Sequence, residues 1–415
     1  MTTIPTGSVT APIVADLRER FLPARLPVLL DVAADIHAHP EIRFTEEHAA
    51  ARLTVELETL GFDVQRGYAD LPTAFIGRWE TPGADDTTPT IAFFCEYDAL
   101  EGIGHACGHN IIAASGLGAA VLTKDALEAG AGAAAGAMAG AEESVEARIV
   151  VIGSPGEEGA AGKVPMIEAG VLKGIDLALM IHPSGYDEAD FLSLARVALD
   201  VDFTGRASHA AASPEAGINA LDASTLSLTA IGLLRQQLRD DARVHTIVTD
   251  GGQAPNIIPE HTALRCFVRA ADRDYLLDTL VPKVEKCFEG AAIATGCEVS
   301  IAQNTPAYLS MVSNPVLVRL AEEAFVAVGR EVETEPIVGG STDMGNVSQL
   351  VPSLHPMICL EPGIENHTRE FTAAAGAEQA EPTIADGSVI IAATALAAFR
   401  DPALVAEARA AFESR

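Results

Sequence analysis

Residues 96–110, with the sequence EYDALEGIGHACGHN, gather side chains of the kinds that bind metal ions. Carboxylates, imidazoles and one thiol stand within a few positions of one another, and Cys107 and His109 lie near the end of the segment. Divalent metals such as zinc use these donor types, so their density indicates a metal site. For Asp98 and His105 the sequence leaves two roles open: each could orient a metal ligand, or each could be an ordinary packing residue.

The neighbouring patterns place this segment at the carboxyl end of a buried strand. Residues 90–95 form a short apolar run, and residues 111–122 are small and apolar at helical spacing. Two further apolar runs, 148–153 and 177–181, are followed by Glu157-Glu158 and by His182. Ligands bind at the carboxyl ends of strands in open α/β sheets. The chain therefore predicts a mainly parallel α/β sheet with these side chains along one edge.

The adjacent acids Glu157 and Glu158 suggest two different roles. Consecutive side chains of an extended segment point to opposite sides, so one can bind a metal while the other faces a metal-bound water as a base. Two metal ions about 3.5–4 Å apart need several ligands, and His367 in a later polar loop adds to the candidates. Each residue alone also has a structural reading, because a single buried His or Cys is more often packed than ligating.

The sequence pattern changes near residue 190, which predicts a second domain. From 197 to 301, strands and helices follow in the order βαββαβ, which suits a small α+β domain with an antiparallel sheet. We therefore expect a discontinuous α/β catalytic domain at 1–193 and 305–415, interrupted by an inserted domain at 194–304. Residues 45–60 predict an amphipathic helix with Thr45 as its N-cap. Residues 129–141 could form a surface loop or extend the preceding helix, and their glycines favour the loop.

The 415-residue chain has a formal net charge of −31, which limits its partners. Such a charge repels nucleic acid and anionic membrane surfaces, so we expect neither as a partner. No apolar run reaches about 20 residues and no basic start precedes an apolar core, so we expect no membrane span and no signal peptide. The six cysteines form no CxxC pair, which is typical of reduced thiols in a cytoplasmic protein.

Several short motifs match one family in order along the chain. They are HACGHN at 105–110, GEEG at 156–159, HP at 182–183, SHA at 208–210, APNIIP at 254–259, STD at 341–343 and HTR at 367–369. Through them the sequence resembles the zinc-dependent aminoacylase/carboxypeptidase family of di-metal amidohydrolases. It is similar to the branch that contains indole-acetyl-amino-acid hydrolases, p-aminobenzoyl-glutamate hydrolases and related dipeptidases.

The resemblance implies a fold and a set of roles. It implies a catalytic domain with two metal ions and an inserted lid domain that also forms a homodimer. Glu157 would be the general base, and His209 in the lid would polarise the scissile carbonyl, often from the partner subunit. Asn256 and Arg269 would hold the substrate carboxylate. The implied metal ligands are Cys107, His109, Glu158, His182 and His367.

The sequence thus predicts a cytoplasmic di-metal amidohydrolase that cleaves the amide bond of an N-acyl amino acid or small peptide conjugate. A metal-bound hydroxide would attack, with Glu157 as the general base. One alternative is a metallo-dipeptidase for dipeptides with a basic or unusual terminal residue. Another is a non-catalytic metal-dependent binding protein, which would not need a base beside the water. The ligand types admit Zn²⁺, Mn²⁺ or Co²⁺, and the acyl group and the bridging ligand stay open.

Overall fold

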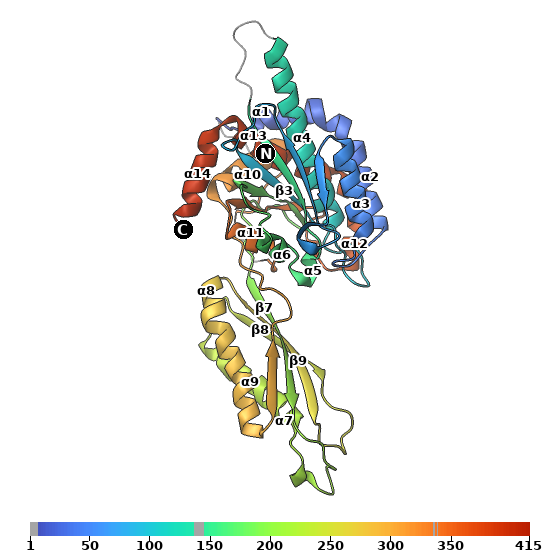
Figure 1. The fold of residues 1–415 in the computed structure, drawn as a ribbon, viewed down its shortest axis with the longest axis vertical. Coiled ribbons are helices and arrows are strands. Elements are labelled where there is room, and N and C mark those ends of the chain that lie inside the picture. Colours follow the sequence, from blue (N-terminus) through green and yellow to red (C-terminus); the bar gives the residue numbers. More distant parts are fainter. Residues whose placement is uncertain (1–6, 137–144, 335–336, 338) are drawn as a thin grey trace. The chain divides into compact units, whose positions relative to one another are not determined.

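The computed structural model describes residues 7–136, 145–334, 337 and 339–415, and they divide into two compact units (Figure 1). Unit 1 contains the described parts of Met1–Leu192, Met311–Val338 and Asn346–Arg415. Unit 2 contains Ser193–Ser310 and Gly339–Gly345. Each unit has its own sheet and its own hydrophobic core.

Unit 1 is built on a six-stranded sheet in the order β1-β2-β4-β3-β5-β11. Strands β4, β3, β5 and β11 run parallel to one another. Strand β2 pairs antiparallel with β4, and β1 pairs antiparallel with β2. A separate parallel pair joins β6 to β12. This mostly parallel sheet confirms the predicted α/β class. The strands are β1 (Asp63–Arg66), β2 (Phe75–Glu80), β3 (Thr90–Cys95), β4 (Arg148–Gly153), β5 (Leu177–Leu179), β6 (His182–Ser184), β11 (Ser353–Leu354) and β12 (Met357–Cys359).

The two longest helices of unit 1 pack against each other. They are α4 (His109–Gly136) and α13 (Ala380–Arg400), and α4 also packs on β3 and on α2. A π-helical turn, Leu17–Phe21, joins α1 to α2, and a 3₁₀ turn covers Tyr68–Asp70. The other helices are α1 (Ala11–Asp16), α2 (Leu22–Ala38), α3 (Glu47–Thr59), α5 (Glu157–Ala160), α6 (Lys163–Glu168), α10 (Pro315–Val328), α11 (Met344–Ser348), α12 (Arg369–Ala375) and α14 (Pro402–Glu413).

The core of unit 1 lies between β3 and the long helices. All six residues of β3 are buried, as expected of a parallel strand covered on both faces. Among the helices that the structure describes, α13 alone is long and apolar enough to cross a membrane by length and composition. Of its most apolar 18-residue stretch, 94% is buried inside the protein, so α13 has the surroundings of a core helix.

A glycine lets α4 approach β3 closely. A Cβ atom at Gly116 would lie 2.6 Å from the carbonyl oxygen of Phe94 and 2.7 Å from Sγ of Cys95. Only glycine fits where two backbones come this close. The contact holds the first turns of α4 beside the carboxyl end of β3, where the predicted ligands begin.

Two local predictions are wrong. Residues 129–136 continue α4 instead of forming a loop, because the alanines between the glycines favour a helix; residues 137–141 of that prediction lie outside the described residues. Thr45 does not cap α3: Glu46 occupies the N-cap position, and the Thr45 hydroxyl donates to the carbonyl of Ile42 instead.

Unit 2 has a four-stranded antiparallel sheet in the order β10-β7-β9-β8. Residues of β7 alternate between buried and half-buried, so one face of the sheet packs on helices and the other is open. Helices α7 and α9 pack together over the sheet. The elements are β7 (Ala195–Thr204), α7 (Ala220–Leu234), β8 (Arg243–Asp250), β9 (His261–Ala270), α8 (Arg273–Tyr275), a π-helical turn (Leu276–Leu280), α9 (Val281–Thr295) and β10 (Glu298–Ala302), with 3₁₀ turns at Pro214–Ala216 and Arg235–Gln237.

Candidate metal centre

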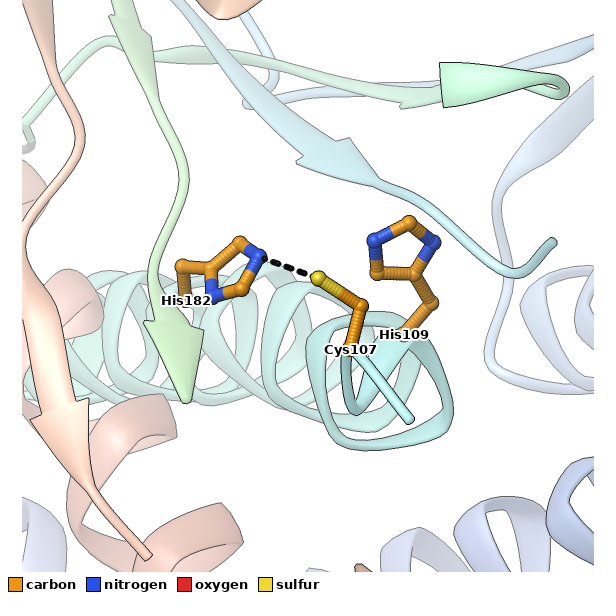
Figure 2. A group of neighbouring side chains, drawn as sticks. All are labelled: Cys107, His109 and His182. Carbon is orange, nitrogen blue, oxygen red and sulfur yellow. Dashed lines mark hydrogen bonds between the residues drawn. The ribbon is translucent and has the colours of Figure 1, made fainter. Parts of the chain in front are cut away.

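The structure brings the five predicted metal ligands of unit 1 together. Cys107 and His109 stand at the start of α4, Glu158 follows β4, His182 begins β6, and His367 lies before α12. Figure 2 shows the sulfur of Cys107 between the rings of His109 and His182. Sγ of Cys107 is 3.5 Å from Nε2 of His182 and 3.5 Å from Nε2 of His367.

Cys107 belongs to two groups of donor atoms. Its Sγ and one ligand atom each of His109 and His182 lie within 4.8 Å of one another, and so do ligand atoms of Cys107, Glu158 and His367. Nε2 of His367 is 3.4 Å from Oε1 of Glu158. Because the two groups adjoin each other and share one residue, their donor atoms could hold two neighbouring ions.

Gly108 separates the two ligands at the start of α4 and is required there. It has a φ of +73°, and a Cβ atom at this position would lie 2.5 Å from Cγ of Pro183. Another residue would be strained in the left-handed region and would collide with the ring. Glycine therefore allows Cys107 and His109 to sit directly against the segment that follows His182.

Outer partners fix which nitrogen of each histidine faces the centre. Nδ1 of His109 lies 3.0 Å from Oδ1 of Asp98, and Nδ1 of His182 lies 2.8 Å from the carbonyl oxygen of Pro183. Both partners are acceptors, so each Nδ1 donates and each Nε2 keeps its lone pair when the ring is neutral. Metal-binding histidines in proteins are oriented in this way.

Asp98 also organises the loop that carries the two acids. Its carboxylate accepts hydrogen bonds from the backbone N–H of Glu157 at 3.2 Å and of Glu158 at 2.8 Å. The sequence left the role of Asp98 open. Its position just after the end of β3, two residues beyond Glu96, could have indicated that it belongs to the centre. His105, the other open residue, is buried and contacts the carbonyl of Ile36 through Nε2.

Glu157 and Glu158 point to different parts of the centre. They lie in a short helical turn rather than in the extended segment that we expected, and non-helical angles at Glu158 and Gly159 break that turn. Glu157 is buried and joins a donor group with His109, whereas Glu158 joins Cys107 and His367. The nearest carboxylate oxygen of each acid is 4.0 Å from Nε2 of His109.

The buried charges of the centre shift one another's pKa. Burial raises the pKa of the Cys107 thiol, but the charge of His182 and hydrogen bonds from His182 and His367 outweigh it and hold the pKa well below its ordinary value. Burial and the Cys107 charge raise the pKa of Glu158 to about 7. Hydrogen bonds with Cys107 and Glu158 raise the pKa of His367 to about 10. The thiolate is the form of cysteine that binds metal.

The chemistry of these residues fits divalent metal ions. Within the described part of the chain, Nε2 of His109 is buried and has no hydrogen-bond partner, and the buried Oε1 of Glu158 has as its nearest contact Nε2 of His367 at 3.4 Å. Buried polar atoms normally have partners, and both residues belong to the donor groups that share the sulfur of Cys107. A thiolate, imidazoles and carboxylates together match the donors that Zn²⁺ and related ions take.

The lid residues predicted for substrate binding separate into two places within unit 2. His209 and Asn256 lie side by side, because Ala210 N–H donates to the carbonyl of Asn256 at 3.0 Å and His209 pairs with Ile257. Both side chains are exposed. Nδ1 of His209 accepts from two backbone N–H groups, which leaves the proton of the neutral ring on Nε2. Arg269 lies near the opposite end of β9.

Comparisons with known proteins indicate a peptidase. A model of the family described as Peptidase family M20/M25/M40 matches residues 85–398. The chain is 37% identical over 390 residues to an Xaa-Arg dipeptidase of Mus musculus, an alignment that covers 92% of this chain and 88% of that protein. It is 34% identical over 287 residues to one component of the p-aminobenzoyl-glutamate hydrolase of Escherichia coli, with coverage of 64% of this chain and 55% of that protein. The fold resembles a crystal structure of a dinuclear metal binding peptidase of Bacillus subtilis, with a TM-score of 0.62, 21% identity and coverage of 90% and 99%.

Proposed function

The chain belongs to peptidase family M20/M25/M40 and hydrolyses amide bonds, and from this premise we propose that it cleaves dipeptides in a centre of two divalent ions. The observation that carries the proposal is the pair of donor groups that share Cys107, with the carboxylate of Glu157 buried beside them. A protein that only binds its ligand would not need such a base, so this arrangement favours catalysis over binding.

Five side chains would hold the ions. When bound, two ions polarise the scissile carbonyl and make a water molecule more acidic. They would be held by Cys107, His109, Glu158, His182 and His367, with Cys107 common to both sites.

The remaining groups would move the proton and position the substrate. Glu157 takes a proton from the attacking water and passes it to the leaving amine, as a positioned carboxylate can. Nε2–H of His209 donates a hydrogen bond to the carbonyl oxygen as negative charge develops there. Arg269 pairs with the carboxylate of the substrate through its guanidinium, and Asn256 contributes a further donor.

A basic terminal residue is the substrate feature that we favour. The Xaa-Arg dipeptidase of Mus musculus matches nearly the whole chain at 37% identity. The net charge of −31 also raises the local concentration of cationic substrates. N-acyl amino acids are the second candidate class, because a hydrolase of p-aminobenzoyl-glutamate matches a large part of the chain.

We further propose that the protein acts as a homodimer. Strand β9 is 10 residues long, which corresponds to about 30 Å, and it separates His209 and Asn256 from Arg269. A dipeptide is too short to contact both ends of this strand. If all three residues act on one substrate, unit 2 of a partner subunit must supply the residues of one end.

We also propose which metal the centre binds and in which compartment the protein works. A thiolate with imidazole and carboxylate ligands favours Zn²⁺, with Mn²⁺ and Co²⁺ as alternatives. All six cysteines are free thiols, which supports a reducing compartment such as the cytoplasm.

Hydrolysis of a mixed substrate panel tests the activity. The panel would contain dipeptides ending in Arg, Lys or a neutral residue, N-acetyl amino acids and p-aminobenzoyl-glutamate. The protein would be assayed as purified, after chelation, after metal is returned, as Glu157→Gln and as the control Glu168→Gln, an exposed acid on α6. We expect chelation and Glu157→Gln to abolish turnover and Glu168→Gln to leave it intact. Two bound ions per chain without turnover of any member would argue against this substrate class.

Hybrid dimers test whether His209 of one subunit acts in the site of its partner. Chains with His209→Ala would be co-expressed with chains with Glu157→Gln, each variant being inactive alone. In a symmetric dimer, half of the molecules would be hybrids with one complete site, which gives about a quarter of the wild-type activity. Activity no higher than that of the single variants would show that His209 and Glu157 act from the same chain.

A further inference from the structure

Glu96 is a buried carboxylate beside the metal centre that the proposed reaction does not use. It follows β3 directly, and its side chain is 1% exposed. Oε1 of Glu96 accepts a hydrogen bond from Nζ of Lys163 at the start of α6, and the side chain of Lys163 is also 1% exposed. A buried ion pair is stable only when its remaining lone pairs are satisfied as well. The second oxygen of Glu96 therefore also needs a partner.

That second oxygen, Oε2, faces His109. It lies 3.5 Å from Nε2 of His109, and neither atom has a hydrogen-bond partner among the described residues. Nδ1 of His109 is engaged with Asp98, so Nε2 carries the lone pair of the neutral ring. With the ring neutral, two buried acceptors face each other, so the contact is favourable only when a cation is shared between them: a proton on the ring when no ion is bound, and a metal ion in its place when the centre is loaded.

The separation of the two acceptors fits two ligands of one ion. Ligands at about 2.0–2.2 Å from a tetrahedral ion lie about 3.4 Å apart, and the observed separation is 3.5 Å. Ligand atoms of Glu96, His109 and Glu157 all lie within 4.8 Å of one another. We propose that Glu96 is an additional ligand, through Oε2, of the ion that His109 holds.

Lys163 orients this ligand. By holding Oε1, its ammonium leaves Oε2 as the oxygen that binds the ion and fixes the plane of the carboxylate, as outer partners of metal ligands do. The same pairing neutralises the buried carboxylate when no ion is bound. The inference rests on the two-metal centre proposed above and adds Glu96 to its ligands.

Metal affinity tests this role without reference to turnover. Wild type and Glu96→Gln would be stripped with a chelator, reloaded with Zn²⁺ and titrated against a competing chelating dye. Glutamine keeps the shape of the side chain but is a poor ligand. We expect the affinity for one ion to fall by more than about 100-fold, beyond the ~10–100-fold loss that is typical when only an outer partner of a ligand is removed, while the other ion stays bound. The control is Asp187→Asn, which disturbs a different, half-buried ion pair, with Arg330, and should bind both ions like the wild type.

Two further variants separate a ligand from a structural counter-ion. Lys163→Met keeps the carboxylate of Glu96, so both ions should still bind. The metal-free variant should be less stable than the metal-free wild type, and added Zn²⁺ should restore this stability. Glu96→Gln/Lys163→Met leaves no buried ammonium unpaired, and it should fold yet retain the weakened site. Unchanged affinity in both Glu96 variants would overturn the inference, and so would an equal loss in Lys163→Met, because the ion pair would then act only on the fold. A wild type that binds fewer than two ions would instead refute the two-metal centre.

Discussion

The buried carboxyl group of Glu46 should make the stability of unit 1 depend on pH. Glu46 is fully buried at the N-terminal end of α3. Oε1 accepts hydrogen bonds from the backbone N–H of Phe44 and of Gly156, both at 2.8 Å, and Oε2 accepts one from the Thr73 hydroxyl at 3.0 Å. The bond to Gly156 ties α3 to the loop that carries Glu157.

The shift in pKa sets the size and sign of the effect. Burial, and then the charge of Asp98, raises the pKa of Glu46 from 4.5 to about 7. A raised pKa in the folded protein means that this group stabilises the fold most below pH 4.5 and that the contribution is lost as the pH rises through about 7. Between pH 5 and pH 8 the free energy of unfolding should fall by about 2–3 kcal/mol through this group.

Glu46→Gln removes this dependence because an amide does not ionise. Its oxygen can still accept from the two backbone N–H groups, and its NH₂ group can donate to the Thr73 hydroxyl. We therefore compare the free energy of unfolding of the variant with that of the wild type at each pH. This difference should shift in favour of the variant by about 2–3 kcal/mol between pH 5 and pH 8.

Urea unfolding followed by fluorescence measures this difference. The single tryptophan, Trp79, lies on β2 and so reports on unit 1. All samples would contain a chelator, so that metal binding does not change with pH. The control is Glu47→Gln at the neighbouring exposed position, which should follow the wild type. A stability difference between Glu46→Gln and wild type that is the same at both pH values would refute the reasoning.

Three further predictions concern the metal centre and the core. Asp98→Asn should weaken metal binding about 10–100-fold, because the variant loses the charge that orients the His109 ring. Competition with a chelating dye measures the affinity, and an unchanged value would contradict this role of Asp98. Metal binding at pH 7 should release protons, because hydrogen bonds to the Cys107 thiolate and the Glu158 carboxylate raise the pKa of His367 to about 10. Calorimetry in buffers of different ionisation enthalpy should show the release, and heats independent of the buffer would exclude it. Arg330→Met leaves the half-buried carboxylate of Asp187 and the buried carboxylate of Asp386 without this partner and should destabilise unit 1 by up to about 3–5 kcal/mol; the urea midpoint measures the loss, and the metal content should not change.

The sequence predicted the site well where its polar residues directly follow buried strands. A parallel strand such as β3 is apolar throughout because both faces are covered, so the polar side chains that follow it stand out. The same reasoning located Cys107, Glu158 and His182 from separate segments, and the structure places their ligand atoms close together. The α/β class followed from the same pattern.

The sequence was less informative where a role depends on contacts between distant residues. Glu96 meets Lys163 67 positions away, and Glu46 meets Gly156 110 positions away. No periodic pattern links such residues, and a lone acid reads as a surface group until its burial is known. The separation of His209 from Arg269 also depends on the length and direction of β9, which motif order along the chain does not reveal.

The charges around the centre indicate how it exchanges protons for metal ions. The Asp98 carboxylate, against the effect of burial, raises the pKa of His109 well above its ordinary value. The Cys107 thiolate does the same, to a lesser extent, for His182. Buried anions must be neutralised by some cation, so these rings hold protons when no ion is bound. The ammonium of Lys163 instead pairs with the outer oxygen of Glu96, away from the ring nitrogens, and it can remain in place when ions displace the protons. Metal affinity should therefore rise with pH through the histidines, while Lys163 contributes a fixed charge.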